Sequence, residues 1–393
     1  MVDNCGVEIS NGQPEKSSAK RKCTENNADT QANFQEDGQK KIKVVDAYFE
    51  SYSNLQCHQT MLMDYRRTQA YRSAILKLYP KVHKNVCLDV GAGTGILSVF
   101  ACQAGAAKVY AVEGSDYMLE IVKRMARENG FENRIEAIGS KLEEWKPDEN
   151  VLVDVLISEW MGYALMTEYM LKSVLARDRY LRKVVLLMPS NASIFMAPVT
   201  ETEWLKEAAV KPWEECEKLY KKLAAFFGKP HKEGYDDTKL SFLSEIEIST
   251  LLEKPYACVH EVQPQDCIAH AQTVLRMDLY KLSLSETDML SGEFNFDCFG
   301  DICFCGFALW FSVKLSEDVT LSTAPELEPT HWSQAVLYLP YSSWTNVHQG
   351  SLIRGSVTIS PSASEERLMN IKLKYKVDDR DTVAVEYNDL VDG

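Results

Sequence analysis

The stretch VCLDVGAGTGILSVFACQAGAAKVYAVEGSD, residues 86–116, decides the fold class. Its first five residues are apolar apart from one carboxylate, as in a strand buried inside a parallel sheet. Three glycines at alternate positions follow, then a helix-like run, and then a second apolar run that ends at Glu113. A strand, a glycine loop, a helix and a strand in this order predict the first βαβ unit of a doubly wound sheet.

The glycine loop has the composition of a ligand-binding loop. Gly91, Gly93 and Gly95 leave the backbone bare before a helix N-terminus, where amide groups can approach a ligand. Glu113 stands where a carboxylate accepts hydrogen bonds from both hydroxyls of a ribose. The dinucleotide fingerprint needs a further glycine at the position of Ile96, so S-adenosylmethionine, which has a ribose but no phosphate, fits better than NAD. That the glycines only allow a tight turn stays open.

Composition limits the class of protein. The 393 residues, 45% apolar and 25% charged, are enough to form two packed cores. The first residues, MVDNCGVEIS, carry no apolar signal segment and the eleven cysteines show no paired spacing, so we expect a reducing intracellular compartment. No uncharged apolar run approaches the roughly 18–20 residues of a membrane span, and we expect no membrane partner.

The net charge of −14 bears on the choice of partner. It argues against a general affinity for nucleic-acid phosphates, so we expect no direct nucleic-acid partner. It favours a cationic partner, although an acidic surface also keeps proteins soluble, and both explanations remain open.

Composition and hydrophobic period divide the chain into three parts. Residues 1–43 are mostly polar and predict a disordered tail, because they cannot bury enough apolar surface to offset the entropy of ordering. Residues 44–189 begin with one or two helices and then alternate strand-like with helix-like runs, which predicts a parallel, helix-covered sheet. Residues 190–393 contain short alternating or aromatic runs such as FALWFSVKL and predict a largely antiparallel β domain.

A charged helical segment at residues 203–230 interrupts the second domain. It carries more large apolar side chains than a solvated helix needs, among them Trp204, Trp213 and Leu219. One interpretation is a helix packed against its own domain, and the other is an arm offered to a second subunit. The residues alone favour neither.

Two carboxylates follow an apolar strand in SEWMGYALMTEYM, residues 158–170. Glu159 comes directly after the strand, at the edge where doubly wound sheets bind ligands, and Glu168 follows on the returning segment. A glutamate pair is most often a solvated surface feature. Here aromatic and apolar neighbours surround both carboxylates, which therefore need a counter-charge. A planar guanidinium with its fork of donors would satisfy both.

Four motifs stand along the chain: YFESY (48–52), DVGAGTG (89–95), SEWMGYALMTEYM (158–170) and THW (330–332). Together they resemble those of the protein arginine methyltransferases, over essentially everything after about residue 44. The resemblance implies an α/β fold with a Rossmann-like S-adenosylmethionine-binding domain followed by a β-barrel-like domain. It also implies that the segment 203–230 is a dimerisation arm, and hence a homodimer.

The resemblance assigns the cofactor contacts residue by residue. The implied cofactor-binding residues are Tyr52, His58, Met61, Arg67, Asp89, Gly91, Gly93, Glu113, Leu142 and Glu143. Arg67 would form a salt bridge to the carboxylate of the cofactor. Glu113 would bind the ribose hydroxyls, and Glu143 would meet the adenine amino group. No metal is implied.

The resemblance also assigns the substrate contacts and the catalytic groups. The implied substrate-binding residues are Tyr48, Tyr52, Glu159, Met161, Tyr163, Glu168, Met170, His331 and Trp332. The implied catalytic residues are Glu159, Glu168, His331 and Asp64: the two glutamates would clamp the target arginine, and His331 would pair with Asp64 across the domain boundary. Met61 and Met170 match methionines beside the target nitrogen in the branch that makes asymmetric dimethylarginine.

The expected function is methyl transfer from S-adenosyl-L-methionine to arginine in proteins such as histone tails and arginine/glycine-rich proteins, with S-adenosyl-L-homocysteine as the other product. The expected products are monomethylarginine and asymmetric dimethylarginine, and the expected location is the nucleus, with the cytoplasm as an alternative. Two rivals stay open. A small-molecule methyltransferase would share the glycine loop and Glu113, and a scaffold without catalysis would share the fold.

Overall fold

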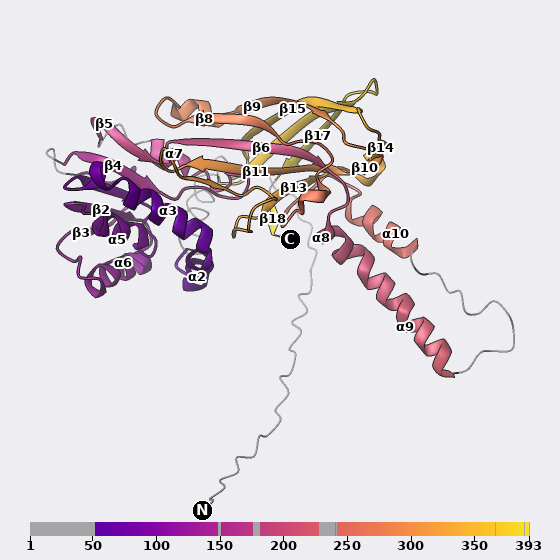
Figure 1. Cartoon of the computed structure of the whole chain (residues 1–393), viewed down its shortest axis with the longest axis horizontal. Coiled ribbons are helices and arrows are strands. Elements are labelled where there is room, and N and C mark those ends of the chain that lie inside the picture. Colours follow the sequence, from indigo (N-terminus) through magenta and orange to yellow (C-terminus); the bar gives the residue numbers. More distant parts are fainter. Residues whose placement is uncertain are drawn as a thin grey trace, which may run out of the picture. The chain divides into compact units, whose positions relative to one another are not determined.

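The structure, a computed structural model, describes residues 52–147, 151–175, 181–227, 240, 242–365, 367–388 and 390–392 (Figure 1). These residues all belong to one compact unit, Lys43–Gly393. The predicted tail, residues 1–43, lies outside the described residues, and so does the predicted substrate residue Tyr48.

The first half forms a five-stranded parallel sheet in the order β3-β2-β1-β4-β5. Its strands are β1 (Val86–Val90), β2 (Lys108–Glu113), β3 (Ile135–Gly139), β4 (Val153–Ser158) and β5 (Leu181–Met188). The strand order reverses between β1 and β4, and ligands bind at the carboxyl ends of the strands at such a point. The glycine loop follows β1 and Glu159 follows β4, so the sheet brings these two segments to one edge.

Local sequence explains the helices around this sheet. They are α2 (Leu55–Met63), α3 (Tyr65–Lys77), α4 (Tyr79–Val82), α5 (Ile96–Gln103), α6 (Asp116–Glu128) and α7 (Leu171–Leu175). Asp64 caps α3 by accepting a hydrogen bond from the Arg67 amide at 2.8 Å, and Ser115 caps α6 in the same way. Gly95 begins α5 with φ at +80°, a conformation that favours glycine.

The second half forms antiparallel sheets. One contains β18, β7, β13, β11, β6 and β8 in this order with β12 beside β11, a second has the order β17-β16-β15-β9, and β10 pairs with β14. The strands are β6 (Asn191–Val199), β7 (Tyr256–His260), β8 (Gln272–Asp278), β9 (Leu290–Asp297), β10 (Ile302–Phe304), β11 (Gly306–Lys314), β12 (Thr320–Ser322), β13 (Gln334–Tyr338), β14 (Thr345–Val347), β15 (Leu352–Pro361), β16 (Met369–Val377), β17 (Val383–Asn388) and β18 (Val391–Asp392). Among the described strands of this half, β18 alone runs parallel to its neighbour, β7.

The two larger antiparallel sheets share an aromatic core. Phe307 of β11 lies 5.4 Å from Phe294 of β9 and 5.7 Å from Tyr375 of β16, measured between ring centroids. Buried aromatic rings at these separations stabilise face-to-face packing of sheets. The prediction of a Rossmann-like domain followed by an antiparallel β domain is confirmed.

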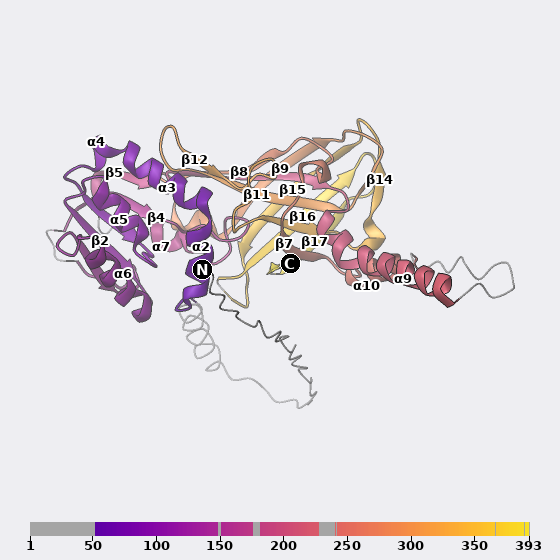
Figure 2. The same cartoon turned by 60° about the horizontal axis from the view of Figure 1, so that its bottom comes forward.

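The segment predicted as an arm is helical where the structure describes it. It comprises α8 (Glu203–Leu205), a π-helical turn η2 (Lys206–Val210) and α9 (Lys211–Phe227), and α10 (Phe242–Leu251) lies beside it in both views (Figures 1 and 2). At its base Trp204 stacks on His260 with ring centroids 5.1 Å apart, and Trp213 donates a hydrogen bond to Glu247 of α10. Leu219 and Tyr220 of α9 are exposed.

Within the described part of the chain, no helix is both long enough and apolar enough to span a membrane.

Candidate active site

A cavity of about 410 Å³ lies at the carboxyl ends of β1, β2 and β4. Segments from both halves of the protein contribute side chains to its wall. The predicted site residues that line it are Tyr52, His58, Met61, Arg67, Gly91, Gly93, Glu113, Leu142, Glu143, Glu159, Met161, Tyr163, Glu168, Met170, His331 and Trp332. The fold thus brings together residues that are widely separated in the sequence.

Two predicted site residues lie outside this wall. Asp64 does not line the cavity, but it forms a hydrogen bond with His331, which does. Asp89, predicted to bind the cofactor, is fully buried behind the glycine loop, where its Oδ2 accepts a hydrogen bond from Ser98 Oγ at 2.6 Å. Burial raises the pKa of Asp89 to about 6 in spite of that hydrogen bond. The structure therefore gives Asp89 a supporting position and not a place in the cavity.

Glu113 accepts hydrogen bonds from the backbone on both sides of its carboxylate, one of them from the glycine loop. Its Oε2 accepts a hydrogen bond from the Gly93 amide at 2.7 Å, and its Oε1 accepts one from the Ser115 amide at 2.8 Å. Gly91 has φ at +70°, and a Cβ placed on it would lie only 2.2 Å from Cε of Met170. The backbone conformation of the loop therefore favours glycine here, and any larger residue would also displace the end of the Met170 side chain.

A buried ion pair joins two residues that were assigned to different ligands. Arg67 donates to Oε2 of Glu159 from Nε at 3.0 Å and from Nη2 at 2.8 Å, and both side chains are 9% exposed. Burial opposes the charge on Arg67, but Glu159 outweighs it and the pKa of the guanidinium is raised. Arg67, expected to bind the carboxylate of the cofactor, thus directly contacts Glu159, expected to bind the substrate.

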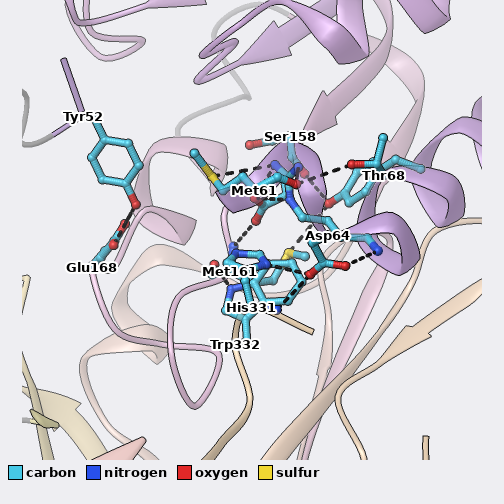
Figure 3. A network of polar contacts seen from close by, with 12 residues as sticks. Tyr52, Met61, Asp64, Thr68, Ser158, Met161, Glu168, His331 and Trp332 are labelled. Carbon is cyan, nitrogen blue, oxygen red and sulfur yellow. Dashed lines mark hydrogen bonds and ion pairs between the residues drawn. The ribbon is translucent and has the colours of Figure 1, made fainter. Parts of the chain in front are cut away.

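The second expected substrate carboxylate accepts hydrogen bonds from a phenol. Tyr52 Oη lies 2.8 Å from Oε1 and 2.9 Å from Oε2 of Glu168 (Figure 3). The backbone oxygen of Tyr52 lies 2.8 Å from Nε2 of His58, which fixes the residue at its other end. Tyr52 therefore lines the cavity with its hydroxyl group directed at Glu168.

Asp64 and His331 connect the two halves beside the cavity. His331 Nδ1 lies 2.7 Å from Oδ2 of Asp64, which also accepts the His331 amide at 3.0 Å (Figure 3). Burial raises the pKa of Asp64, but the hydrogen bonds from His331 and Arg67 outweigh it and the pKa is lowered overall. Next in the chain, Trp332 Nε1 donates to the backbone oxygen of Met161 at 2.9 Å. The THW motif therefore contacts both α3 and the segment between the two glutamates.

The cavity wall also contains residues that sequence reasoning did not assign to the site, among them Ser173 and Arg367. Ser173 of α7 donates a hydrogen bond to Glu143. Arg367, between β15 and β16, contacts the main chain of Glu168. No motif or periodicity marks Arg367, because its contact depends on how a distant connection between two strands lies against the Glu168 segment.

The described residues include no group of three or more histidine, cysteine, aspartate or glutamate side chains that could hold a metal ion.

Comparisons with known proteins agree with this fold. Residues 87–181 match a family model described as a methyltransferase domain, and residues 190–380 match one described as an arginine methyltransferase oligomerization subdomain. Protein arginine N-methyltransferase 6 of Xenopus tropicalis is 38% identical over 333 residues, which is 84% of this chain and 91% of the relative. The chain belongs to the protein arginine N-methyltransferase family.

Solved structures in the family share the fold. Protein arginine methyltransferase 10 of Arabidopsis thaliana superposes with a TM-score of 0.71 at 29% identity, over 87% of this chain and 99% of that chain. The Trypanosoma brucei PRMT1 enzyme-prozyme heterotetrameric complex with AdoHcy gives a TM-score of 0.70 at 28% identity, over 86% and 99% of the two chains. The activity of this protein is S-adenosylmethionine-dependent methylation of arginine in proteins.

Proposed function

We propose that the protein forms monomethylarginine and then asymmetric dimethylarginine in basic proteins, with histone tails and arginine/glycine-rich proteins as the substrate class. The observation that carries the proposal is the presence of Glu159 and Glu168 in the wall that also contains the glycine loop and Glu113. One guanidinium can donate hydrogen bonds to two carboxylates, because its N–H donors lie in one plane and match the planar carboxylate groups. The acidic net charge of −14 favours such cationic substrates.

The cavity fits S-adenosylmethionine in size and chemistry. A volume of about 410 Å³ is within the range of small-molecule sites. Glu113 would accept from the ribose, Glu143 from the adenine amino group, and Arg67 would pair with the carboxylate of the cofactor. When bound, the cofactor supplies an electrophilic methyl group on a sulfonium.

The residues of the chain would then make one guanidinium nitrogen a better nucleophile. A guanidinium is a weak nucleophile because its positive charge is delocalised over three nitrogens. Glu159 and Glu168 would draw that charge toward the nitrogens they contact and leave the third nitrogen electron-rich. Arg67 fixes Glu159, and Tyr52 fixes Glu168, before any substrate arrives. The catalytic contribution is orientation and electrostatic preorganisation, with His331 and Asp64 holding the segments in place.

The two methionines would set the product. Met61 and Met170 both line the cavity, and Met170 presses against the glycine loop. Such crowding would admit the methylated nitrogen to the methyl donor again and exclude its unmethylated counterpart, which gives the asymmetric isomer. This is the type I pattern.

We also propose a homodimer formed through the helical arm, and a nuclear location with the cytoplasm as the alternative. The match of residues 190–380 to an oligomerization subdomain supports assembly, and the exposed Leu219 and Tyr220 support α9 as the contact surface. The nuclear location follows from the proposed histone substrates.

Product analysis tests the proposal. The full chain is incubated with labelled S-adenosylmethionine and an arginine–glycine peptide, beside the same peptide with lysine in place of arginine. We expect label in the arginine peptide alone and fragment ions of monomethylarginine and asymmetric dimethylarginine. Symmetric dimethylarginine as the main product would overturn the type I assignment, and label confined to small molecules would overturn the substrate class.

A further inference from the structure

Arg367 forms hydrogen bonds with both the backbone amide and the backbone carbonyl of Glu168. The Glu168 amide donates to the backbone oxygen of Arg367 at 2.7 Å, and Nη1 of Arg367 donates to the Glu168 backbone oxygen at 3.0 Å. Glu168 lies on the segment between β4 and α7, whereas Arg367 lies on the connection between β15 and β16. The antiparallel domain therefore holds the main chain of a carboxylate in the other half of the protein.

The held segment has an unfavourable backbone conformation. Glu168 has φ at +74°, and Ala164, Leu165 and Tyr169 also have positive φ. Left-handed backbone is uncommon for residues with a Cβ and persists only where the surrounding structure imposes it. Gly162 allows the segment to fold back on itself, since a Cβ there would lie 2.1 Å from the Thr167 backbone oxygen. The direction of the Glu168 side chain depends on this conformation.

Several side chains of the same segment contribute no hydrogen bond to holding it. Trp160 Nε1, Thr167 Oγ1 and Tyr169 Oη are buried and have no hydrogen-bond partner among the described residues. Inside the segment, main-chain bonds such as that from the Leu165 amide to the Gly162 oxygen at 3.0 Å close the turn. The contacts from Arg367 act at Glu168 itself, at the end of the segment that carries the carboxylate.

The charge of Arg367 gives a second reason to look for a structural role. Arg367 lines a cavity that, on the proposed function, receives a substrate guanidinium, and two like charges repel. Attraction of the substrate therefore does not explain a cation at this place. The Arg367 guanidinium donates a hydrogen bond to the Glu168 backbone oxygen, which supports a structural role.

We infer that Arg367 is a positioning residue for the substrate carboxylate of Glu168. Arg367 lies on the connection between β15 and β16 and stabilises the left-handed backbone conformation of Glu168. The carboxylate of Glu168 therefore keeps its place in the cavity. The kinetic consequence of this role rests on the proposed function, whereas the effect on the Glu168 main chain does not.

Hydrogen exchange of the segment 162–170 tests the structural part without any assay of activity. Arg367→Ala is compared with the unchanged protein and with Arg354→Ala, which removes an exposed arginine of β15 that does not line the cavity. We expect exchange of the Glu168 amide to become about tenfold faster in Arg367→Ala alone, because its local opening becomes easier. Unchanged exchange would overturn the inference.

Steady-state kinetics with an arginine peptide tests the functional part. We expect kcat/KM of Arg367→Ala to fall about tenfold or more, with the Kd of S-adenosylhomocysteine within about twofold of the unchanged protein. Arg367→Lys should recover part of the loss, because an ammonium still donates to the Glu168 carbonyl. An Arg367→Ala enzyme with unchanged kcat/KM would overturn the inference.

A double substitution separates positioning from a general loss of structure. If Arg367 acts through Glu168, Arg367→Ala should cost less than about threefold once Glu168→Gln has removed the charge. An undiminished loss in the Glu168→Gln background would overturn the inference. Failure of the unchanged protein to methylate any arginine peptide would count against the proposed function, and hydrogen exchange would still decide the role of Arg367.

Discussion

Arg67 and Glu159 form a contact that sequence reasoning did not anticipate. The family resemblance placed Arg67 at the carboxylate of the cofactor and Glu159 at the target arginine, and in the structure they form one buried ion pair. Each is therefore the partner of the other and, on the proposed function, of a ligand as well. Removal of either charge leaves the other buried without its partner, which is costly in a protein interior.

Glu159→Gln should therefore reduce stability as well as activity. The glutamine amide can still accept a hydrogen bond, but Arg67 loses its anionic partner, so the free energy of unfolding should fall by about 1–3 kcal/mol. Glu144→Gln makes the same change at an exposed position and should alter it by less than about 0.5 kcal/mol. Urea denaturation followed by circular dichroism measures both. Equal stability of the two variants would show that the ion pair contributes nothing net.

Glu168→Gln tests the localisation of charge on the substrate. The substitution keeps the shape of the side chain and deletes its charge, so kcat at saturating peptide should fall by about 10² or more. The Kd of S-adenosylhomocysteine, measured by calorimetry, should stay unchanged, because Glu168 is assigned to the substrate. A normal kcat with a raised KM would mean that the carboxylates only position the arginine.

Asp89 should make stability depend on pH. Its pKa in the folded protein is about 6, above the ordinary value of 3.8, so folding favours the protonated form. Its contribution to stability is fully present below pH 3.8 and is lost as the pH rises through 6. Asp89→Asn should gain stability relative to the unchanged protein across this window, by about 3 kcal/mol at most.

Denaturation at a series of pH values measures this difference for Asp89→Asn. Asp379→Asn, an exposed site, supplies the control and should show no comparable trend. A difference for Asp89→Asn that is flat from pH 4 to 7 would contradict the expected ionisation.

At the scale of elements, contiguous patterns were predictable and contacts across the chain were not. The unit β1–α5–β2 could be predicted because one short stretch contains the strands, the helix and the glycine loop. Glu159 could be placed at the edge of the sheet because it directly follows a strand. Arg367 could not be placed, because its role depends on the packing of the connection between β15 and β16 against Glu168.

The helix α9 should carry the subunit contact. Leu219→Asp with Tyr220→Asp places two charges on exposed apolar positions, and we expect a monomer with at least about tenfold lower activity. Lys222→Ala changes a neighbouring exposed residue that is already polar and should leave the assembly intact. Light scattering after size-exclusion chromatography measures the mass. A dimer that survives the two aspartates would place the interface elsewhere.

At the scale of the whole molecule, one hydrophobic core runs through both halves. It includes Ile157 of β4 and Ile194 and Phe311 of the antiparallel domain, together with Trp332 beside the cavity. The site itself is divided in the same way, since the glutamates come from the first half and His331 and Arg367 come from the second. Neither half contains a complete site.

Thermal unfolding should therefore show one cooperative transition that includes both halves. S-adenosylhomocysteine at 100 times its Kd should stabilise the whole fold by about 2.7 kcal/mol, because it binds the folded state. Calorimetry should show a single peak that shifts as a unit. Two peaks, of which only one responds to the ligand, would show that the halves unfold separately.

The close approach of Met170 to Gly91 limits how this protein can evolve. The methionine proposed to set the number and placement of methyl groups lies against the loop proposed to hold the methyl donor, and a Cβ added at Gly91 would lie 2.2 Å from its terminal carbon. A bulkier residue at position 170 would press on that loop, and any side chain at position 91 would displace Met170. A substitution at either position should therefore affect two traits at once. New product patterns in a lineage should arise together with changes in donor affinity.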